Sequence, residues 1–300
     1  MTTAHIPVSG LLRMHKQWLE NPGEGRRADL TGMTLNEAMF AGADLREAIL
    51  HSSTLLDANL AGAILKRARL NRADLQRAHM AGADLTGAEI SQADFAGAWL
   101  QDAILAEATG AGFSMRRAKL VDARMPDAAF REANFRQVSA VRAIFQHVRL
   151  SSVDFQGSEV SDAQFRHSSL QHVNFLASVG VFANFAGARM DHCDFSEADM
   201  RGTKFSRAEL VQCRFHNASL ADCDFRDAKV LGGDFNHAVL AGARFGNAQF
   251  KMADFRGANL RAARELTSDQ LSQTLTDQST ILPNGSNGPY RRMSGAERPR

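Results

Sequence analysis

The sequence has little cysteine, proline, tyrosine or tryptophan, and it contains no long apolar run. Its 300 residues include three Cys, six Pro, one Tyr and two Trp. Three cysteines are too few for the disulfide framework on which small secreted domains depend. No segment has the roughly 20 apolar residues that a membrane-spanning helix needs, and the N-terminus does not resemble a secretory signal. We therefore expect a cytoplasmic protein that does not associate with membranes.

A charge excess of either sign is also missing. The 35 Lys and Arg are nearly balanced by 33 Asp and Glu, which gives a formal net charge of +2. The basic residues are dispersed among acidic ones, with few aromatic residues between them, so direct binding to DNA or RNA is not expected. The sequence also lacks a Gly-rich phosphate loop, a CxxC pair and an HExxH motif. We predict a protein that is not an enzyme, and we assign it no catalytic, cofactor-binding or metal-binding residue and no cofactor.

What the sequence does contain is a repeat of five residues. From Leu30 to Leu260, nearly every position divisible by five is Leu, Phe, Met, Ile or Val, and no insertion breaks the register over 47 pentads. We call these positions the centres. The residue two positions before a centre is mostly Ala, and the residue directly before it is often Asp or Asn. Short polar side chains can bond to nearby backbone, so we interpret these Asp and Asn residues as turn formers.

A period of five fits neither a regular helix nor a flat strand. Five residues of an α-helix turn through about 500°, which would scatter the centres around the helix. Along a strand, an odd period would point successive centres to opposite faces. The chain can keep all centres inside only by turning once per pentad. The twelve centres spaced by ten residues from Phe145 to Phe255 are all Phe, and ten divides a coil of 20 residues but not one of 15, so we predict four-sided coils.

The pentads resemble the signature of the pentapeptide repeat family. Residues 83–87 read ADLTG and residues 93–97 read ADFAG, and the resemblance extends over about residues 28–262. It implies an all-β fold, a right-handed quadrilateral β-helix in which each centre and the Ala two residues before it point inward. At a strand spacing of about 4.8 Å, about twelve coils would form a rod roughly 55 Å long.

The pattern is absent before the first coil. Apolar residues at helical spacing between Val8 and Leu19 predict a helix, so we expect an N-terminal helical cap in residues 1–27. Such a cap would cover the backbone edge of the first coil, which could otherwise pair with another chain. The β-helix itself would occupy residues 28–264.

The pattern also fades after Leu260. The sequence Thr267-x-x-Gln270 has the form of a capping box, so we predict a second helical cap in residues 265–282. Residues 283–300 are rich in Pro, Gly, Ser and Arg and contain little apolar surface. We expect this last segment to be a disordered tail.

A few inward positions depart from the repeat. Gly110 leaves its centre empty, and Phe113 stands where a small residue belongs, so we expect the Phe113 ring to fill that void. Gly180 is a second empty centre, and Phe182 beside it falls at a nominally outward position. The three cysteines all take the small inward position and are interpreted as buried fillers: Cys193, Cys213 and Cys223.

Two pairs of histidines are separated by one coil, His147 with His167 and His172 with His192. Each pair would place two imidazoles side by side. A closed metal site needs ligands that converge at about 2 Å from the ion, and no carboxylate or thiolate clearly converges on either pair. We interpret the four histidines as solvated corner residues.

The four sides of the coil differ in charge, and we name them the Leu30, Leu35, Phe40 and Leu45 faces after their first centres. Counting the residue before each centre and the two after it, the Phe40 face holds ten charged residues, against twelve, fifteen and sixteen on the other three. It also holds the most large apolar residues. Charge depletion with exposed apolar groups is typical of an interface core, although the same residues could equally be tolerated surface groups or local packing. The candidate partner face consists of Met39, Trp99, Val121, Val141, Val179, Val181, Phe182 and Val239.

These observations leave two classes of function. The first is a rigid, non-enzymatic scaffold that binds an unknown partner protein, or a second copy of itself as a homodimer, through a lateral face. The second follows from the resemblance, because some pentapeptide repeat proteins mimic DNA, bind DNA gyrase and protect it from topoisomerase poisons. Mimicry needs dense negative charge, since duplex DNA carries one charge per about 1.7 Å. The outward positions of the repeats sum to −1, so the scaffold is our primary hypothesis and modulation of gyrase is the alternative.

Overall fold

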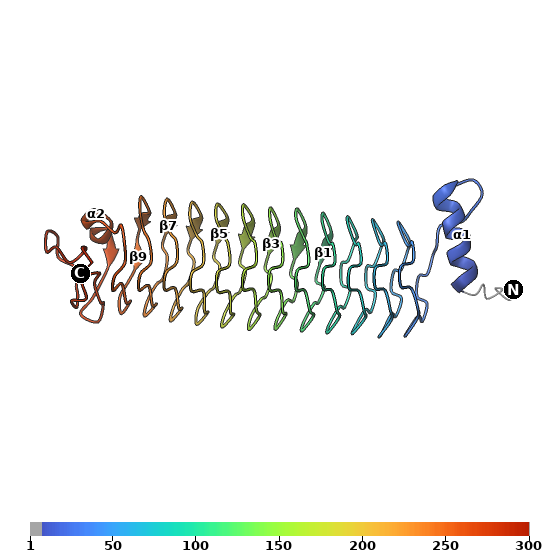
Figure 1. Ribbon diagram of the computed structural model, residues 1–300, viewed down its shortest axis with the longest axis horizontal. Helices are drawn as coiled ribbons and strands as arrows, with labels where there is room; N and C mark the ends of the chain where they lie inside the picture. Colours follow the sequence, from blue (N-terminus) through green and yellow to red (C-terminus); the bar gives the residue numbers. More distant parts are fainter. Residues whose placement is uncertain (1–7, 300) are drawn as a thin grey trace.

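The computed structural model describes residues 8–299, and it shows a straight rod of stacked coils with a helix at each end (Figure 1). Helix α1 (Val8–Glu20) lies at the N-terminal end and the short helix α2 (Ser268–Ser272) at the C-terminal end. Residues 1–7 of the predicted N-terminal cap and residue 300 of the predicted tail lie outside the described part. Neither of the two helices in residues 8–299 is long and apolar enough to cross a membrane.

One side of the rod, the Leu30 face, carries an eight-stranded parallel sheet. Each strand pairs with the next one along the chain, and paired residues are twenty positions apart, as in Thr109 with Ala129. The sheet consists of β1 (Thr109–Ala111), β2 (Ala129–Arg131), β3 (Arg149–Ser151), β4 (Ser169–Gln171), β5 (Arg189–Asp191), β6 (Glu209–Val211), β7 (Lys229–Leu231) and β8 (Gln249–Lys251).

Single bridges extend the same register over the other faces and toward both ends. They join residues twenty positions apart, from Asp29 with Ile49 at one end to Arg244 with Arg264 at the other. At twenty residues a turn, this span covers almost twelve turns, of which eight carry a strand of the main sheet. The four-sided coil predicted from the spacing of the phenylalanines is therefore confirmed.

Each corner of a coil is a tight turn. The amide of Ala48 donates to the carbonyl of Leu45 (3.0 Å), and Glu47 between them has φ of +60°. A hydrogen bond across four residues with positive φ at the third is the arrangement of a type II β-turn. The polar residue before a centre braces the turn, as predicted: the Oδ1 of Asp94 accepts the amide of Ala96 (2.9 Å).

The interior is filled by the centres and by the small residues two positions before them. Phe165 and Phe185, on successive coils, stack with their centroids 4.7 Å apart and their planes 4° apart. Rings from the opposite face meet them edge-on, as Phe175 meets Phe185 at 84°. This continuous stack is buried from Phe135 onward. Two ladders of rings on opposite faces therefore form the core of the C-terminal half.

The Phe113 ring fills the empty centre at Gly110, as the sequence predicts, and Met200 fills the one at Gly180. A Cβ placed on Gly110 would lie 2.9 Å from the ring of Phe113, and one on Gly180 would lie 2.5 Å from the Sδ of Met200. The three cysteine side chains are buried in the inward positions expected of them. Burial also raises the pKa of the Cys193 thiol, which keeps that thiol protonated.

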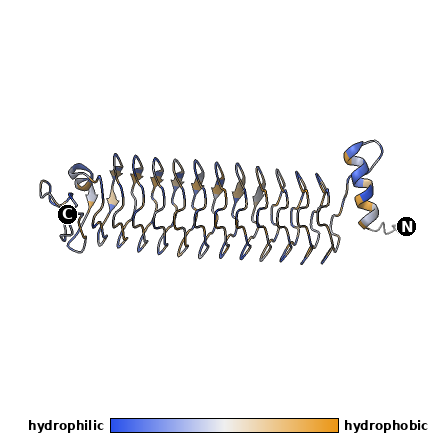
Figure 2. Cartoon of the chain, in the orientation of Figure 1, coloured by the Kyte–Doolittle hydropathy of each residue, from blue (hydrophilic) through white to orange (hydrophobic). Residues whose placement is uncertain are grey.

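Helix α1 covers the first coil with one apolar side, and Figure 2 shows strongly hydrophilic and strongly hydrophobic residues along the same helix. His15, on the inner side of this helix, is fully buried, and its Nδ1 accepts the backbone amide of Ala28 (3.1 Å). The chain returns from the helix so close to it that a Cβ on Gly25 would collide with the backbone of Trp18. The helix thus satisfies a backbone group at the open edge of the solenoid.

The C-terminal cap differs in part from the prediction. The capping box is present, because the Oγ1 of Thr267 accepts the amide of Gln270 (3.2 Å) and the Oε1 of Gln270 accepts the amide of Thr267 (2.7 Å). Helix α2 has only five residues, however. The chain then forms β10 (Thr274–Leu275), which pairs in parallel with β9 (Ala253–Asp254). Residues 274–275 and 281 therefore add backbone pairs to the last coil, whereas the prediction placed a helical cap over residues 265–282, since the coil edge offers unpaired backbone groups.

The prediction of a disordered tail in residues 283–300 is wrong for the described residues 283–299. Asn287 pairs with Ile281 in an antiparallel bridge, and the hydroxyl of Tyr290 donates to the Oγ of Ser268 (2.6 Å). Ala296 is buried. The composition of the segment suggested disorder because the segment alone could not bury enough apolar surface, but the end of the solenoid supplies the missing surface and backbone partners.

Candidate functional surface

The eight residues of the candidate partner face lie along one side of the rod. The bridges place their positions in register, as between His79 and Trp99 and between Val179 and Asp199. Five of the eight side chains are exposed: Met39 (74%), Trp99 (41%), Val179 (42%), Phe182 (62%) and Val239 (40%). The other three, Val121, Val141 and Val181, are half-buried.

Trp99 is held by its neighbours on the coils before and after it. Its ring stacks on His79, with centroids 5.6 Å apart and planes 15° apart. The Nζ of Lys119 lies 4.1 Å from the centroid of the Trp99 ring, which is a cation–π contact. The indole is therefore oriented before any partner arrives, and part of its surface is already used for local packing.

Phe182 occupies a corner position with φ of +60° and is the most exposed aromatic residue in residues 8–299. Its ring lies over Gly202 on the next coil, where an added Cβ would sit 2.5 Å from the ring. Glycine at that position gives the ring a flat surface to rest on. Together with Val179 and Val181, Phe182 forms an apolar corner.

Four of the ten charged residues on the Phe40 face are paired with one another. The guanidinium of Arg142 binds both carboxylate oxygens of Asp122 on the preceding coil (2.8 and 2.6 Å). This bond lowers the pKa of Asp122. Arg201 forms the same two contacts with Asp199 (2.8 and 2.7 Å). The face thus presents apolar side chains beside two ion pairs that are complete within the chain.

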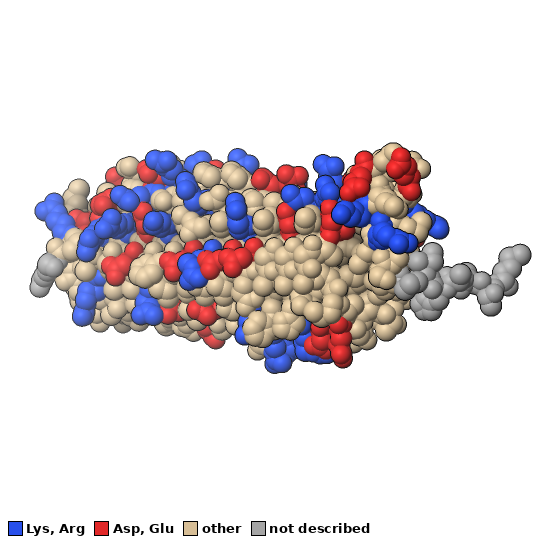
Figure 3. All heavy atoms as spheres, turned by 45° about the vertical axis from the view of Figure 1, so that its right-hand side comes forward, with Lys and Arg blue, Asp and Glu red and all other residues tan. Residues whose placement is uncertain are grey.

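The other faces carry more numerous ion pairs between coils. Arg77 binds Asp57 across one coil on the Leu35 face (2.6 Å), and Lys229 binds Glu209 on the Leu30 face (3.2 Å). Figure 3 shows acidic and basic side chains intermingled over much of the visible surface, beside one broad area without charged residues. The mixture of signs agrees with the balanced charge of the sequence.

Two exposed apolar residues on the Leu30 face were not predicted. Leu231 and Met252 are 42% and 77% exposed, and Leu231 lies with Val211 in a shallow groove beside the aliphatic parts of Lys229 and Lys251. The count of large apolar residues at outward positions could have found both. They are fewer and more scattered than those of the Phe40 face.

A surface hollow of about 440 Å³ lies on the Leu45 face. It forms because Ala186 has only a methyl group and Gly187 has no side chain, whereas the coils on either side carry Arg166 and Arg207. His167 leans into the same place over Gly187. The hollow is basic in character, but Asp227 also lines it.

The two pairs of histidines, which look alike in the sequence, have different surroundings in the structure. His147 and His167 stack with centroids 5.5 Å apart, and Gln146 and Arg166 precede them. His172 and His192 lie 5.1 Å apart, and Asp191 joins them. Sequence reasoning missed this carboxylate, although its place directly before His192 was a signal that it shares the same corner.

The parallel four-sided coil, the buried centres and the corner turns define a class of β-solenoid. Sequence profiles described as pentapeptide repeat region and pentapeptide repeats match more than half of the chain. The chain belongs to the pentapeptide repeat family. The matched residues are 148–222 for the repeat region, 26–60, 55–92 and 118–157 for the eight-copy profile, and 215–259 for the nine-copy profile.

Several solved structures are similar to this chain. HetL, a pentapeptide repeat protein involved in heterocyst differentiation regulation in the cyanobacterium Nostoc sp. strain PCC 7120, is 20% identical, with 95% of this chain and all of HetL covered and a TM-score of 0.26. The plasmid-mediated fluoroquinolone resistance protein QnrB1 is 15% identical over 59% of this chain and 82% of its own, with a TM-score of 0.31. A pentapeptide repeat protein of the Arabidopsis thaliana thylakoid lumen is 29% identical over 37% and 67%, with a TM-score of 0.24. A comparison with curated protein sequences found no match.

Proposed function

We propose that this protein is a rigid, non-enzymatic scaffold that binds another protein through the Phe40 face. One observation carries the proposal: of the nine large apolar side chains exposed in residues 8–299, five lie on this face. The same face has the fewest charged residues of the four. Interfaces differ from ordinary surface by this depletion of charge and enrichment of aromatic residues at their core.

The architecture supports such a role because it keeps the binding groups in place. Backbone hydrogen bonds between coils recur throughout, as from the amide of Leu100 to the carbonyl of Lys119 (2.8 Å). Trp99 is fixed between His79 and Lys119. A surface that is already ordered loses little conformational freedom on binding, so more of its contact energy appears as affinity.

The occupant of this face is a protein with an extended, mostly apolar surface, and a second copy of the chain fits that description. Near the N-terminal end, the Ala-Gly pairs at residues 41–42, 61–62 and 81–82 leave a strip almost without side chains, on which another flat face can lie. We place this activity in the cytoplasm, in keeping with the balanced composition of the chain.

A double substitution on each of two faces tests the proposal. Trp99→Asp with Val141→Asp puts two charges into the Phe40 face. Ile104→Asp with Ile144→Asp is the matched control, because these half-buried residues hold outward positions on the neighbouring Leu45 face. We expect sedimentation velocity and affinity capture to show self-association or partner binding in the wild type and the control, and its loss in the Trp99/Val141 variant.

Circular dichroism and thermal unfolding verify that each variant is folded. Binding that survives in the Trp99/Val141 variant but is lost in the control would show that the interface lies on the Leu45 face and not on the Phe40 face. A wild-type protein that stays monomeric and captures no partner would contradict the scaffold proposal itself.

A further inference from the structure

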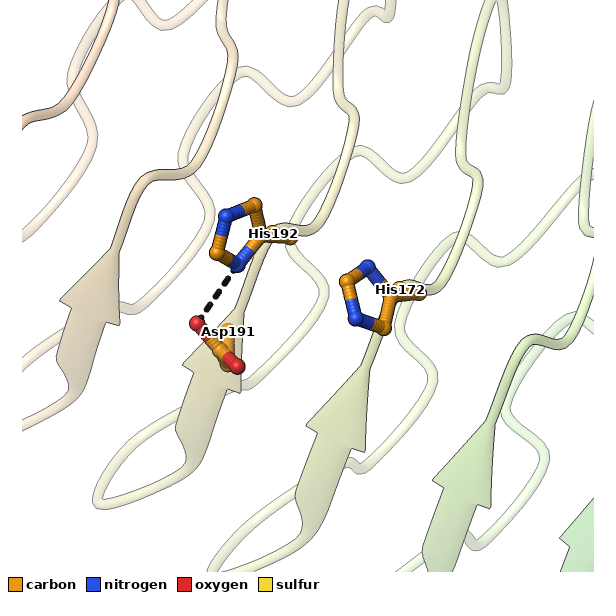
Figure 4. A group of neighbouring side chains, drawn as sticks. All are labelled: His172, Asp191 and His192. Atoms are coloured by element: carbon orange, nitrogen blue, oxygen red, sulfur yellow. Dashed lines mark hydrogen bonds and ion pairs between the residues drawn. The ribbon is translucent and has the colours of Figure 1, made fainter.

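Three metal-ligating side chains meet at one corner of the Leu30 face. His172 follows β4 and His192 follows β5, so the pairing of these strands places the two imidazoles on successive coils. Asp191 is the last residue of β5 and lies directly before His192. Figure 4 shows the three side chains gathered at the ends of the two strands.

The distances within this group are short. The Nδ1 of His192 lies 2.8 Å from the Oδ1 of Asp191, and the centroids of the two imidazoles are 5.1 Å apart. One ligand atom from each of the three residues lies within 4.8 Å of the others. Ligand atoms bound to one transition metal at about 2 Å are at most about 4 Å apart, so small rotations of these side chains would complete the set.

The backbone of the group is held more firmly than its side chains. The amide of His172 donates to the carbonyl of Asp191 (2.9 Å), so the corner of one coil is bonded to the end of the strand in the next. The side chains of Asp191 and His192 remain 40% and 53% exposed, which leaves room for rotation and for water ligands. Arg189, the cation on the same strand, forms an ion pair with Glu209 (3.6 Å) and not with the carboxylate of Asp191.

We propose that His172, Asp191 and His192 form a surface binding site for a divalent transition-metal ion, for which Zn²⁺ is the best fit. Two imidazole nitrogens and one carboxylate oxygen suit Zn²⁺, Cu²⁺, Ni²⁺ or Co²⁺, whereas Mg²⁺ and Ca²⁺ prefer oxygen ligands alone. Three protein ligands leave at least one position of the ion for water or for a group from another molecule. The site lies on a different face from the proposed partner surface, so the outcome of one proposal's test does not depend on the other proposal.

Such an ion would join two successive coils. In a solenoid, stability is approximately the sum of the contributions of each coil and of each interface between neighbours. A ligand that binds only the folded state raises the unfolding temperature. Zn²⁺ bound to His172 and His192 is therefore expected to stabilise the interface between their two coils.

The chain supplies its own control. His147 and His167 also lie on successive coils, with stacked imidazoles 5.5 Å apart, but within residues 8–299 neither belongs to a group of three metal-ligating side chains. If two neighbouring histidines were enough to bind the ion, both pairs would bind it equally. If the carboxylate matters, only the corner with Asp191 will bind.

The experiment is a titration of the full, tag-free chain with ZnCl₂, in which calorimetry and the shift in unfolding temperature measure binding. MgCl₂ serves as the comparison ion. Four proteins are compared: the wild type, His172→Gln, Asp191→Asn, and the double variant His147→Gln with His167→Gln. We expect one equivalent of Zn²⁺ to bind to the wild type and to the His147/His167 variant. Loss of an outer-shell partner typically weakens metal binding 10- to 100-fold, so loss of a direct ligand in His172→Gln or Asp191→Asn should weaken it by at least about tenfold.

Co²⁺ provides a second readout, because its visible absorption depends on the nitrogen and oxygen atoms bound to it. The bands should appear in the wild type and in the His147/His167 variant and be reduced in the other two. The proposal is overturned if no saturable binding occurs, or if His172→Gln and Asp191→Asn bind Zn²⁺ as the wild type does. It is equally overturned if the His147/His167 variant loses the bound equivalent.

Discussion

The phenyl ring of Phe113 occupies the space inside the coil that Gly110 leaves empty. A Cβ on Gly110 would lie 2.9 Å from the Cδ1 of Phe113 and 2.7 Å from the Cγ1 of Ile90. The ring also packs edge-on against Phe130, with centroids 4.9 Å apart. Within this coil, Phe113 at the usually small position thus fills the space of the side chain that Gly110 lacks at the centre.

This arrangement predicts that the two positions are energetically coupled. Phe113→Ala should destabilise the protein by about 3–5 kcal/mol, because it leaves a cavity. Gly110→Leu should cost about 1–3 kcal/mol, because it overpacks the same space. The double variant restores Leu at the centre 110 and Ala at the small position before Met115, so its loss should be smaller than the sum of the two. Thermal unfolding measures all three, and strictly additive losses would refute the coupling.

The phenylalanine ladders should dominate the stability of the C-terminal half. Phe195 is buried and stacks on Phe175 and Phe215, with centroids 4.8 and 5.1 Å apart. Phe195→Ala should cost about 3–5 kcal/mol. Ser196→Ala, at the next and outward-facing position, should change the unfolding temperature little. Similar shifts from the two substitutions would show that the ring contributes no more than a surface residue.

Acid should loosen the N-terminal helix. Burial lowers the pKa of His15 below its ordinary value of 6.5, although the charge of Asp44 opposes this and Arg27 and Arg46 favour it. Because its Nδ1 accepts the amide of Ala28, protonation of that nitrogen would break the bond. When α1 is packed on the first coil, His15 binds protons less readily than when the helix is detached. The stability of the packed helix is therefore complete above about pH 6.5 and falls as the pH drops below that value.

Hydrogen exchange of peptides from residues 8–30 at pH 7.5 and 5.5, corrected for intrinsic rates, measures this effect. We expect more frequent opening at the lower pH. His15→Gln retains an acceptor but does not titrate, so it should remove the pH dependence. Equal opening of the wild type at both pH values would contradict the role given to His15.

The segment after the last coil should prevent end-to-end association. Asn287 pairs with Ile281 in an antiparallel bridge, which covers an edge that would otherwise continue the parallel register. Deleting residues 284–300 should expose that edge and produce oligomers in light scattering. Arg292→Ala, which removes only the exposed ion pair with Asp269, is the control and should leave the oligomeric state unchanged. A truncated protein that behaves as the full chain does would show that the edge needs no cover.

Strong inhibition of DNA gyrase is not expected. Basic residues are interspersed with the carboxylates on the faces, and several carboxylates are paired with arginines, as Asp57 is with Arg77, so the rod has no continuous acidic surface like that of DNA. A supercoiling assay should therefore show no inhibition at submicromolar protein. Potent inhibition there would favour the alternative function over the scaffold.

The five-residue repeat alone determined the four-sided coil, the inward centres and the place of the Phe40 face. It could do so because every coil uses the same turn: one register fixes which side chains point inward and which residues are neighbours twenty positions apart. Even the exception at Gly110 and Phe113 was readable, since an empty centre and an oversized small position stand three residues apart.

Only the tertiary structure decided where side chains meet across coils and how the rod ends. The stacking of Trp99 on His79 and the approach of Asp191 to His192 depend on side-chain rotations that the repeat does not specify. The order of residues 283–299 depends on the exposed end of the solenoid, which supplies partners for Asn287 and Tyr290. A periodic sequence specifies its own repeat, but the contacts at its surface and at its ends involve residues that occur once, and their partners are fixed only when the chain has folded.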